Sequence, residues 1–422
     1  MSLYLRCYIL TALGLIATVA ATCAPQSRLT LADDLRIAEL LPAAAYGINI
    51  DDFFLDQTSD RVFLSLQYSI PPPPNTPAEQ WRDYFHWEAF VLGRKQFAVL
   101  GRYPLRFDST DVYSSRFTGI AGLDADGTGA ILSSGYQLVH WNYRTGEVRT
   151  LWAQQDTEYF THVLHRAAVT DDGRYAAVVF EEVNRRGGKG GTIPRGWQFQ
   201  LVVIDVTTGA NLRSCFLGSA FSAGPPVFPP IALSEDAKLF FHHTVRSELE
   251  DGFAVVDTTT CQQLRRWKFP EPPLEGVFLD AGRALAVSFD GGMSGKRIRL
   301  MDVASGSTLR EVHSPPGMFT LTTLSLAPDR RALLFPITVA NRWFWELPGE
   351  SHHYTACGLD IVDLPTGKRV ATIRPPGMAL KSCPFDWNMN AKFTRDGRFA
   401  ALVSNNGIQL YSVPASLLST RP

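Results

Sequence analysis

One short turn motif recurs seven times along the chain and constrains the fold more than any other feature. Each copy combines residues such as Asp, Gly, Ser and Thr and is followed by a β-rich run, such as residues 175–180 or 399–403. Asp and Gly suit tight hairpins because they tolerate the positive φ that such turns demand. The seven turns lie at residues 58–61, 124–127, 170–174, 234–238, 280–283, 327–330 and 394–398. A repeat at this spacing predicts one array of similar units rather than a series of unrelated domains.

A second turn lies downstream of the first in most units. It is rich in Asp, Thr and Gly, as at 205–209 and 363–367, and apolar strands precede and follow it. The pattern therefore predicts four antiparallel strands in each unit, named a to d. The first turn joins a to b, and the second joins c to d. Four such strands make one blade of a propeller. The expected fold is all-β: a seven-bladed β-propeller of four-stranded antiparallel blades, preceded by a signal segment.

The repeats also carry a resemblance to a known family. They resemble the PD40 and YVTN repeats of bacterial WD40-like propellers and of the quinoprotein amine dehydrogenase β-chain-like group, over roughly residues 45–413. The shared features are turn chemistry and strand pattern, whereas the Trp-Asp and Gly-His pairs of WD40 repeats are missing. Such features specify a fold better than a function. The resemblance implies a propeller that serves either as a binding protein or as a subunit of an enzyme.

The composition agrees with one large β-rich domain. Hydrophobic residues make up 45% of the 422 residues and charged residues 19%, which suits a packed core cut by many turns. The net charge is −1, whereas nucleic-acid binding needs a clustered positive field, so no nucleic acid is expected as a partner. We expect a signal at 1–23, a tether with a possible closing strand at 24–44, and a single propeller domain at 45–422.

The first two dozen residues have the features of an export signal. Arg6 precedes an apolar run over 8–19, and small residues lie before Cys23. Cleavage after Ala21 would release a secreted protein, whereas lipidation of Cys23 would give a periplasmic or cell-envelope lipoprotein; an uncleaved anchor is the third alternative. The chain is expected to be exported, and to meet a membrane through this segment alone.

Three of the seven units carry long insertions between strands b and c. They span 70–86 in unit one, 182–198 in unit three and 336–357 in unit six. In a propeller the b–c loops and the links between blades emerge on one face, and the a–b and c–d turns emerge on the other. We call these the insert face and the turn face. The predicted ligand-binding residues on the insert face are Trp81, Tyr84, Trp197, Arg342, Trp343, Trp345, Tyr354 and Trp387.

Aromatic side chains on loops suggest recognition. Large rings supply contact area at low entropy cost and dominate binding hot spots. The alternative is that the rings pack the inserts onto the propeller as a small additional core. We expect a module that binds a protein, peptide or glycan on the insert face; the alternative is a subunit of a quinoprotein-like dehydrogenase or another propeller enzyme.

No catalytic motif supports the enzyme alternative. The glycine-rich segment 185–192 lacks the Walker spacing, and 291–296 matches neither a Walker motif nor a nucleophile elbow. The chain has no Cys-x-x-Cys-His for haem and no His-Glu-x-x-His for zinc. His242 and His243 lie on a predicted strand, where neighbouring side chains point to opposite faces and cannot share a metal. No catalytic residue, metal site or cofactor is expected.

The cysteines predict one disulfide. Cys357 and Cys383 both lie on the insert face, and an exported protein meets an oxidising compartment, so we expect them to be bonded. Cys215 lies in the outer strand of unit three and Cys261 in the c–d turn of unit four. We expect those two to remain unpaired.

Closure of the ring needs a shared blade. Unit seven offers three clear strands and a short tail after Pro414. We therefore expect part of residues 28–41 to pair along the strand ending at Val413, as the outer strand of blade seven, which removes an open edge. In the competing arrangement residues 416–420 form that strand.

Overall fold

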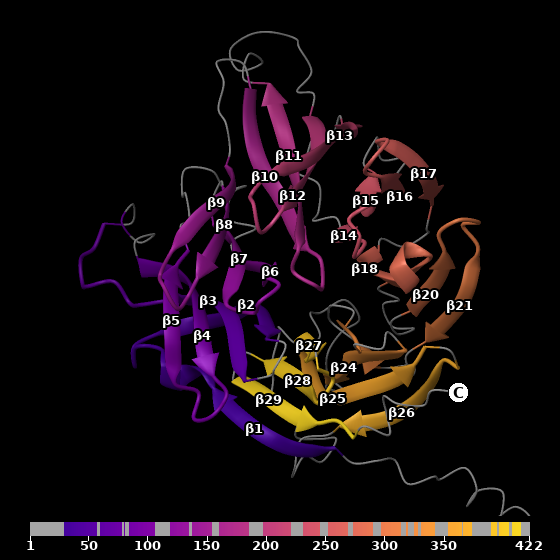
Figure 1. Ribbon diagram of the computed structural model, residues 1–422. Helices are drawn as coiled ribbons and strands as arrows, with labels where there is room; N and C mark the ends of the chain where they lie inside the picture. The colour runs from indigo at the N-terminus through magenta and orange to yellow at the C-terminus, as the bar shows by residue number, and fades with distance from the viewer. Residues whose placement is uncertain are drawn as a thin grey trace, which may run out of the picture.

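Seven β-sheets stand around a central axis and form a closed ring (Figure 1). This computed structural model describes residues 29–414 apart from several internal segments. Those segments are 57–59, 78–79, 81–83, 106–118, 135–136, 154–159, 185–196, 221–230, 245–251, 269–272, 290–296, 314–317, 320–324, 328–330, 342–352, 365, 374–389, 395 and 405–406. The predicted seven-bladed, all-β propeller is confirmed.

The first five blades each contain four consecutive strands, ordered from the axis to the rim. Blade 1 comprises β2 (Tyr46–Leu55), β3 (Arg61–Ser69), β4 (Phe85–Gly93) and β5 (Val99–Pro104). Blade 2 comprises β6 (Gly119–Leu123), β7 (Gly129–Ser134), β8 (Gln137–Asn142) and β9 (Val148–Ala153). Blade 3 comprises β10 (Phe160–Val169), β11 (Tyr175–Asn184), β12 (Trp197–Asp205) and β13 (Asn211–Ala220). Blade 4 comprises β14 (Ile231–Leu233), β15 (Leu239–Thr244), β16 (Gly252–Asp257) and β17 (Gln262–Trp267). Blade 5 comprises β18 (Pro273–Leu279), β19 (Ala284–Phe289), β20 (Arg297–Asp302) and β21 (Thr308–His313).

The last two blades depart from this plan. In blade 6 two short strands, β22 (Met318–Phe319) and β23 (Ser325–Leu326), pair with the same inner edge of β24 (Ala332–Asn341). The blade continues with β25 (His353–Asp363) and β26 (Lys368–Ile373). Blade 7 comprises β27 (Asn390–Phe393), β28 (Phe399–Ser404) and β29 (Gly407–Ser412), and takes its fourth strand from the N-terminal part of the chain, β1 (Thr30–Arg36).

The core lies in the joints between neighbouring blades, with one cluster of buried apolar side chains in each of the seven joints. In β11, Val178 packs with Ile131 of blade 2, whereas Val179 packs with Phe240 of blade 4. Successive side chains of a strand point to opposite faces, so a sheet with neighbours on both sides needs apolar residues at every position. This explains the continuous apolar runs that follow the predicted turns.

The c–d turns repeat one local structure. Gly146, Gly209, Gly306 and Gly367 occupy equivalent positions with φ between 67° and 76°, a conformation that glycine adopts without steric cost. An aspartate or asparagine begins each turn; Asp205, for example, accepts a hydrogen bond from the backbone N–H of Thr208 at 2.8 Å. Such side-chain bonds replace backbone partners and fix the turn.

Arginines of the outer strands hold the c–d turn of the next blade. Arg149 of β9 donates to the backbone oxygen of Thr207 in blade 3 at 2.8 Å. Arg213 of β13 contacts Thr258 Oγ1 in blade 4 at 2.9 Å, and Arg265 of β17 contacts the backbone oxygen of Ala304 in blade 5. The turn face is therefore tied from blade to blade by charged hydrogen bonds.

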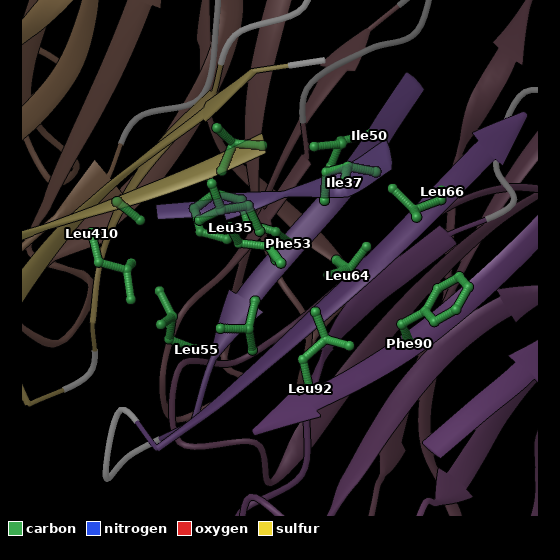
Figure 2. Close-up of a cluster of buried hydrophobic side chains, with 14 of the residues drawn as sticks. Leu35, Ile37, Ile50, Phe53, Leu55, Leu64, Leu66, Phe90, Leu92 and Leu410 are labelled. Atoms are coloured by element: carbon green, nitrogen blue, oxygen red, sulfur yellow. The ribbon is translucent and has the colours of Figure 1, made fainter. Parts of the chain in front are cut away.

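Strand exchange closes the ring, as predicted. β1 runs antiparallel to β29, with Thr30 opposite Ser412 and Arg36 opposite Gly407. A short 3-10 helix, η1 (Ile37–Leu40), follows and leads into blade 1. Leu35 and Ile37 are buried in the joint between blades 7 and 1, where Figure 2 shows Leu35 beside Phe53 and Ile37 beside Ile50. Residues 416–420, the competing candidate, lie outside the described residues.

The prediction that Cys215 and Cys261 remain unpaired is wrong. These two cysteines are bonded, with a Cα separation of 5.3 Å, which suits a disulfide. The two cysteines lie this close together because β13, the outer strand of blade 3, runs beside the c–d turn of blade 4. Cys261 takes the position that glycine occupies in the other turns, with φ 56°. The predicted bond between Cys357 and Cys383 stays a prediction, since Cys383 lies outside the described residues.

Candidate functional site

The inserts of blades 3 and 6 begin and end as extensions of strands b and c, rather than as loops throughout. The pairing of β11 with β12 extends to Val183 opposite Trp197, and that of β24 with β25 to Asn341 opposite His353. The b–c pairs of the blades without inserts are shorter, as in β7 with β8, which ends at Ser134 opposite Gln137. Regular backbone pairing therefore carries each of these inserts outward on a two-stranded stem.

Three of the eight predicted insert-face residues belong to the described part of the chain. Tyr84 is half-buried, and its backbone oxygen accepts a hydrogen bond from Ile70 at 3.0 Å across the base of the blade 1 insert. Trp197 is the first residue of β12, and Tyr354 lies opposite Ala340 at the far end of β25. The other five lie outside the described residues: Trp81, Arg342, Trp343, Trp345 and Trp387. The lipidation candidate Cys23 also lies outside them.

Two exposed rings outside the eight predicted ligand-binding residues lie at the insert-face end of blade 1. Tyr46 begins β2 and is 52% exposed, and Phe85 begins β4 and is 46% exposed. Both lie opposite Ser69 of β3, one on either side, so their side chains emerge on the same face of the sheet. Large exposed rings on one face form a contact surface of the kind that binding sites use.

A buried polar network supports this end of blade 1. Glu88 binds Arg102 through both carboxylate oxygens, at 2.8 and 2.6 Å, and accepts a hydrogen bond from Tyr68 at 3.0 Å. The His86 ring stacks on Tyr68 with 5.0 Å between centroids. A bidentate ion pair with a buried tyrosine restricts these side chains, which lie on the face of the sheet opposite to Phe85.

Charged side chains also occupy the innermost strands, where the blades meet at the axis. They are Asp52 on β2, Arg166 on β10, Glu275 on β18 and Lys392 on β27, from blades 1, 3, 5 and 7. Asp52 interacts electrostatically with Lys392 and Arg166, and Lys392 interacts in addition with Glu275 and Asp171. We call these four side chains the axial charges.

Lys392 and Asp52 are held by their neighbours. Lys392 Nζ donates to the backbone oxygen of Phe53 at 2.9 Å and lies 3.6 Å from the ring centroid of Phe54. The Asp52 carboxylate lies so close to Gly119 of blade 2 that a Cβ there would be 2.6 Å from Asp52 Oδ2. Burial raises the pKa of Asp52 to about 6, although Lys392 and Arg166 oppose the effect. Burial likewise lowers the pKa of Lys392.

The sequence did contain a signal for the axial charges. Each is a charged residue within a predicted inner strand that is otherwise mostly apolar, two to six residues before an a–b turn. A single charged residue in a strand is common, and only the closed ring brings four of them together. Among the described residues, no group of three or more His, Cys, Asp or Glu side chains could hold a metal ion. No helix in the described part of the chain is long and apolar enough to cross a membrane.

Comparisons with known proteins agree on the fold. No family model matches the chain, and no curated protein matches it. An oligogalacturonate lyase in complex with manganese matches with a TM-score of 0.54 at 14% identity, over 93% of this chain and 99% of the other. The β-propeller domain of Cps50 (Swd1) from Myceliophteria thermophila matches with a TM-score of 0.50 at 10% identity, over 92% of this chain and 100% of the other. The fold is that of a WD40-like β-propeller.

A second lyase structure gives the same result. The oligogalacturonate lyase from Vibrio parahaemolyticus matches this chain with a TM-score of 0.50 at 12% identity, over 88% of this chain and 99% of the other. At these identities the likeness concerns the fold alone, because one propeller architecture serves enzymes and scaffolds alike. The function has to be argued from the site.

Proposed function

We propose that the protein is an exported propeller that binds a protein, peptide or glycan on its insert face. The observation that carries the proposal is the pair of exposed rings, Tyr46 and Phe85, at the insert-face end of blade 1. The stems of blades 3 and 6 carry Trp197 and Tyr354 at their insert-face ends. We expect the rings of Trp197 and Tyr354 to extend this contact surface to three blades.

Export is supported by the cysteine chemistry. The bond between Cys215 and Cys261 is of a kind that persists in oxidising compartments and is rare in reducing ones. The segment 1–23 would supply the signal, with Cys23 as the lipidated residue of a cell-envelope lipoprotein or with cleavage after Ala21 in a secreted form. In this proposal residues 45–422 form one binding domain.

The test screens the folded protein against a glycan array and a displayed peptide library, and then measures the affinity of the best ligand by calorimetry. Phe85→Ala and Trp197→Ala should each weaken binding by about tenfold or more, because truncating a hot-spot ring costs at least 1–2 kcal/mol. Melting temperatures should stay nearly unchanged. Phe216→Ala is the matched control, since Phe216 is 57% exposed on the outer strand β13 and away from the insert face.

Two results would contradict the proposal. One is that Phe216→Ala weakens ligand binding as much as the insert-face variants do. The other is a large stability loss in the insert-face variants with unchanged affinity for the ligand. The second outcome would identify the rings as packing residues of the inserts.

A further inference from the structure

Exposed aliphatic side chains gather at the turn-face ends of the outer strands. The strands β5, β9, β13, β17 and β21 begin directly after the c–d turns, so their first residues lie at the rim of the turn face (Figure 1). Within the described part of the chain, most of the exposed large hydrophobic side chains lie at this rim. They are Leu31, Val99, Leu100, Val148, Leu212, Leu264 and Leu309.

Four of these residues occupy the same position in a β-bulge. In β13, residues 211 and 213 pair with neighbouring residues of β12, which leaves Leu212 as the extra residue. Leu100, Leu264 and Leu309 hold the equivalent position in β5, β17 and β21. We call these four residues the rim leucines; they are between 44% and 54% exposed. Exposed edge strands usually carry charged residues, so a leucine that recurs at one exposed position indicates a surface that something covers.

The N-terminal segment reaches the propeller on the same face. β1 runs antiparallel to β29, so Thr30 lies opposite Ser412 at the turn-face end of blade 7. Leu29, which precedes β1, is buried in the joint between blades 6 and 7. Residues 24–28 separate Leu29 from Cys23. A stretch of this length spans at most about 20 Å when extended, so an attachment at Cys23 keeps the turn face within reach of a lipid surface.

We propose that the turn face lies against a lipid bilayer, with the rim leucines in contact with lipid and the insert face pointing away from the membrane. The inference rests on the signal segment of the proposed function remaining attached to the membrane, through lipidation of Cys23 or as an uncleaved anchor. It adds the rim to the one membrane contact that the sequence predicts. Aliphatic side chains gain free energy when they leave water for the boundary between headgroups and acyl chains.

The distribution of the rim leucines favours a bilayer over a protein partner. They belong to four different blades, so they form a broken ring rather than one contiguous apolar patch. Protein interfaces are built around a closely packed centre, whereas fluid lipid adapts to separate side chains. Attachment at the N-terminus also raises the effective concentration of lipid at the turn face, so a few weak contacts are enough to orient the propeller.

Labelling with a photoactivatable lipid tests the contact in the full-length protein. The protein is purified from membranes and reconstituted into phosphatidylcholine vesicles that contain a phospholipid with a diazirine in its acyl chain, close to the headgroup. After illumination, mass spectrometry should find lipid adducts in the peptides that contain Leu212, Leu264 and Leu309. Their yield should exceed that of the peptides with Tyr46 and Phe85 by about tenfold or more, because the insert face lies away from the lipid.

Variants connect the adducts to the rim leucines. Leu212→Ser, Leu264→Ser and Leu309→Ser, combined in one protein, should lower the adduct yield in blades 3 to 5 by about fivefold or more. Phe216→Ser is the matched control, because Phe216 is an exposed apolar residue of β13 that lies beyond the turn-face end of the strand. This control should label as the wild-type protein does. Circular dichroism establishes that each variant is folded, and exposed positions of this kind should leave the melting temperature nearly unchanged.

Several outcomes would overturn the inference. One is that the protein is absent from the membrane fraction, and another is that anchored protein carries adducts near its N-terminus alone. A third is that the insert-face peptides label as strongly as the rim, or that the folded triple variant keeps its adducts. A dimer that the triple variant disrupts, with no lipid adducts at the rim, would identify a second copy of the chain as the occupant instead.

The inference and the proposed function fail separately. A ligand screen without a hit leaves the lipid adducts at the rim unchanged. Conversely, a rim without adducts leaves the affinity of an insert-face ligand as it was, since the rim leucines lie on the opposite face.

Discussion

The joint between blades 7 and 1 and the joint between blades 3 and 4 are both reinforced, but by different means. At the first joint β1 adds a strand to blade 7, and Arg94 of blade 1 pairs with Asp33 of β1 at 2.9 Å. At the second joint a covalent bond links Cys215 of blade 3 to Cys261 of blade 4.

The difference follows from how the chain passes each joint. Blades 7 and 1 come last and first in the sequence, so without strand exchange no backbone link would cross the joint between them. Exchange of a strand brings such a link, because the segment from β1 through η1 to β2 passes from blade 7 into blade 1. Blades 3 and 4 are consecutive in the chain, but the inner strand of blade 4, β14, has three residues. The disulfide strengthens a joint whose inner strand is short.

Of the changes that test this comparison, removal of the exchanged strand β1 should have the largest effect on the free energy of unfolding. Deletion of residues 24–41 takes Leu35 and Ile37 out of the joint and leaves the edge of β29 unpaired. We expect a loss of about 5 kcal/mol or more in the free energy of unfolding, since each buried aliphatic side chain contributes about 2–5 kcal/mol. The single cooperative transition should broaden, as measured by circular dichroism during heating.

Deletion of residues 24–28 alone serves as the control. It leaves β1 in place and should not change the melting curve. An unchanged melting curve for the longer deletion would show that β1 does not hold the ring closed.

Breaking the disulfide should have the second largest effect. The bond closes a loop with a sequence separation of 46 residues, so Cys261→Ser should lower the free energy of unfolding by about 3–4 kcal/mol. Cys261→Gly should lose about 1 kcal/mol less, because glycine adopts the positive φ of this position without strain. Denaturant titration of both variants gives the comparison.

Reduction of the wild-type protein provides an independent check. If reduced wild-type protein is as stable as the oxidised form, the bond does not reinforce the joint. If Cys261→Gly is less stable than Cys261→Ser, the turn does not favour glycine at this position.

Much of the fold could be predicted because its determinants are local. The residues that mark the c–d turns, such as Asp205 and Gly209, fix their turns through contacts within five residues. Seven copies of the a–b turn, most of them followed by a c–d turn, leave few folds other than a propeller. The closing strand was predictable from one counting argument, since blade seven had three strands and an open edge needs a partner.

The cysteine pairing and the axial charges could not be predicted in the same way, because both depend on contacts between blades. Cys215 and Cys261 lie on different elements of different blades, and their proximity follows from the offset between an outer strand and the next c–d turn. The four axial charges are far apart in the sequence, and only the folded ring brings them together at its axis. For Cys261, one local signal was present: a cysteine stands where four other c–d turns have glycine.

The smallest predicted effect concerns Arg94, which joins β1 to blade 1 at the rim. Its Nε lies 2.9 Å from Asp33 Oδ2, and its guanidinium lies 4.3 Å from the centroid of the Phe399 ring in blade 7. Arg94→Lys keeps the charge but loses the planar group that stacks on the ring, so we expect a loss of about 1 kcal/mol in the free energy of unfolding. Lys95→Met is the control, because Lys95 is an exposed neighbour in the same turn and should have no measurable effect. Denaturant titration at low and high salt separates the two contributions of Arg94: the ion pair weakens with salt, whereas stacking on Phe399 remains. If Arg94→Lys and Lys95→Met are equally stable at both salt concentrations, then Arg94 does not reinforce the joint between blades 7 and 1, and β1 and the buried cluster around Leu35 hold it without help from the rim.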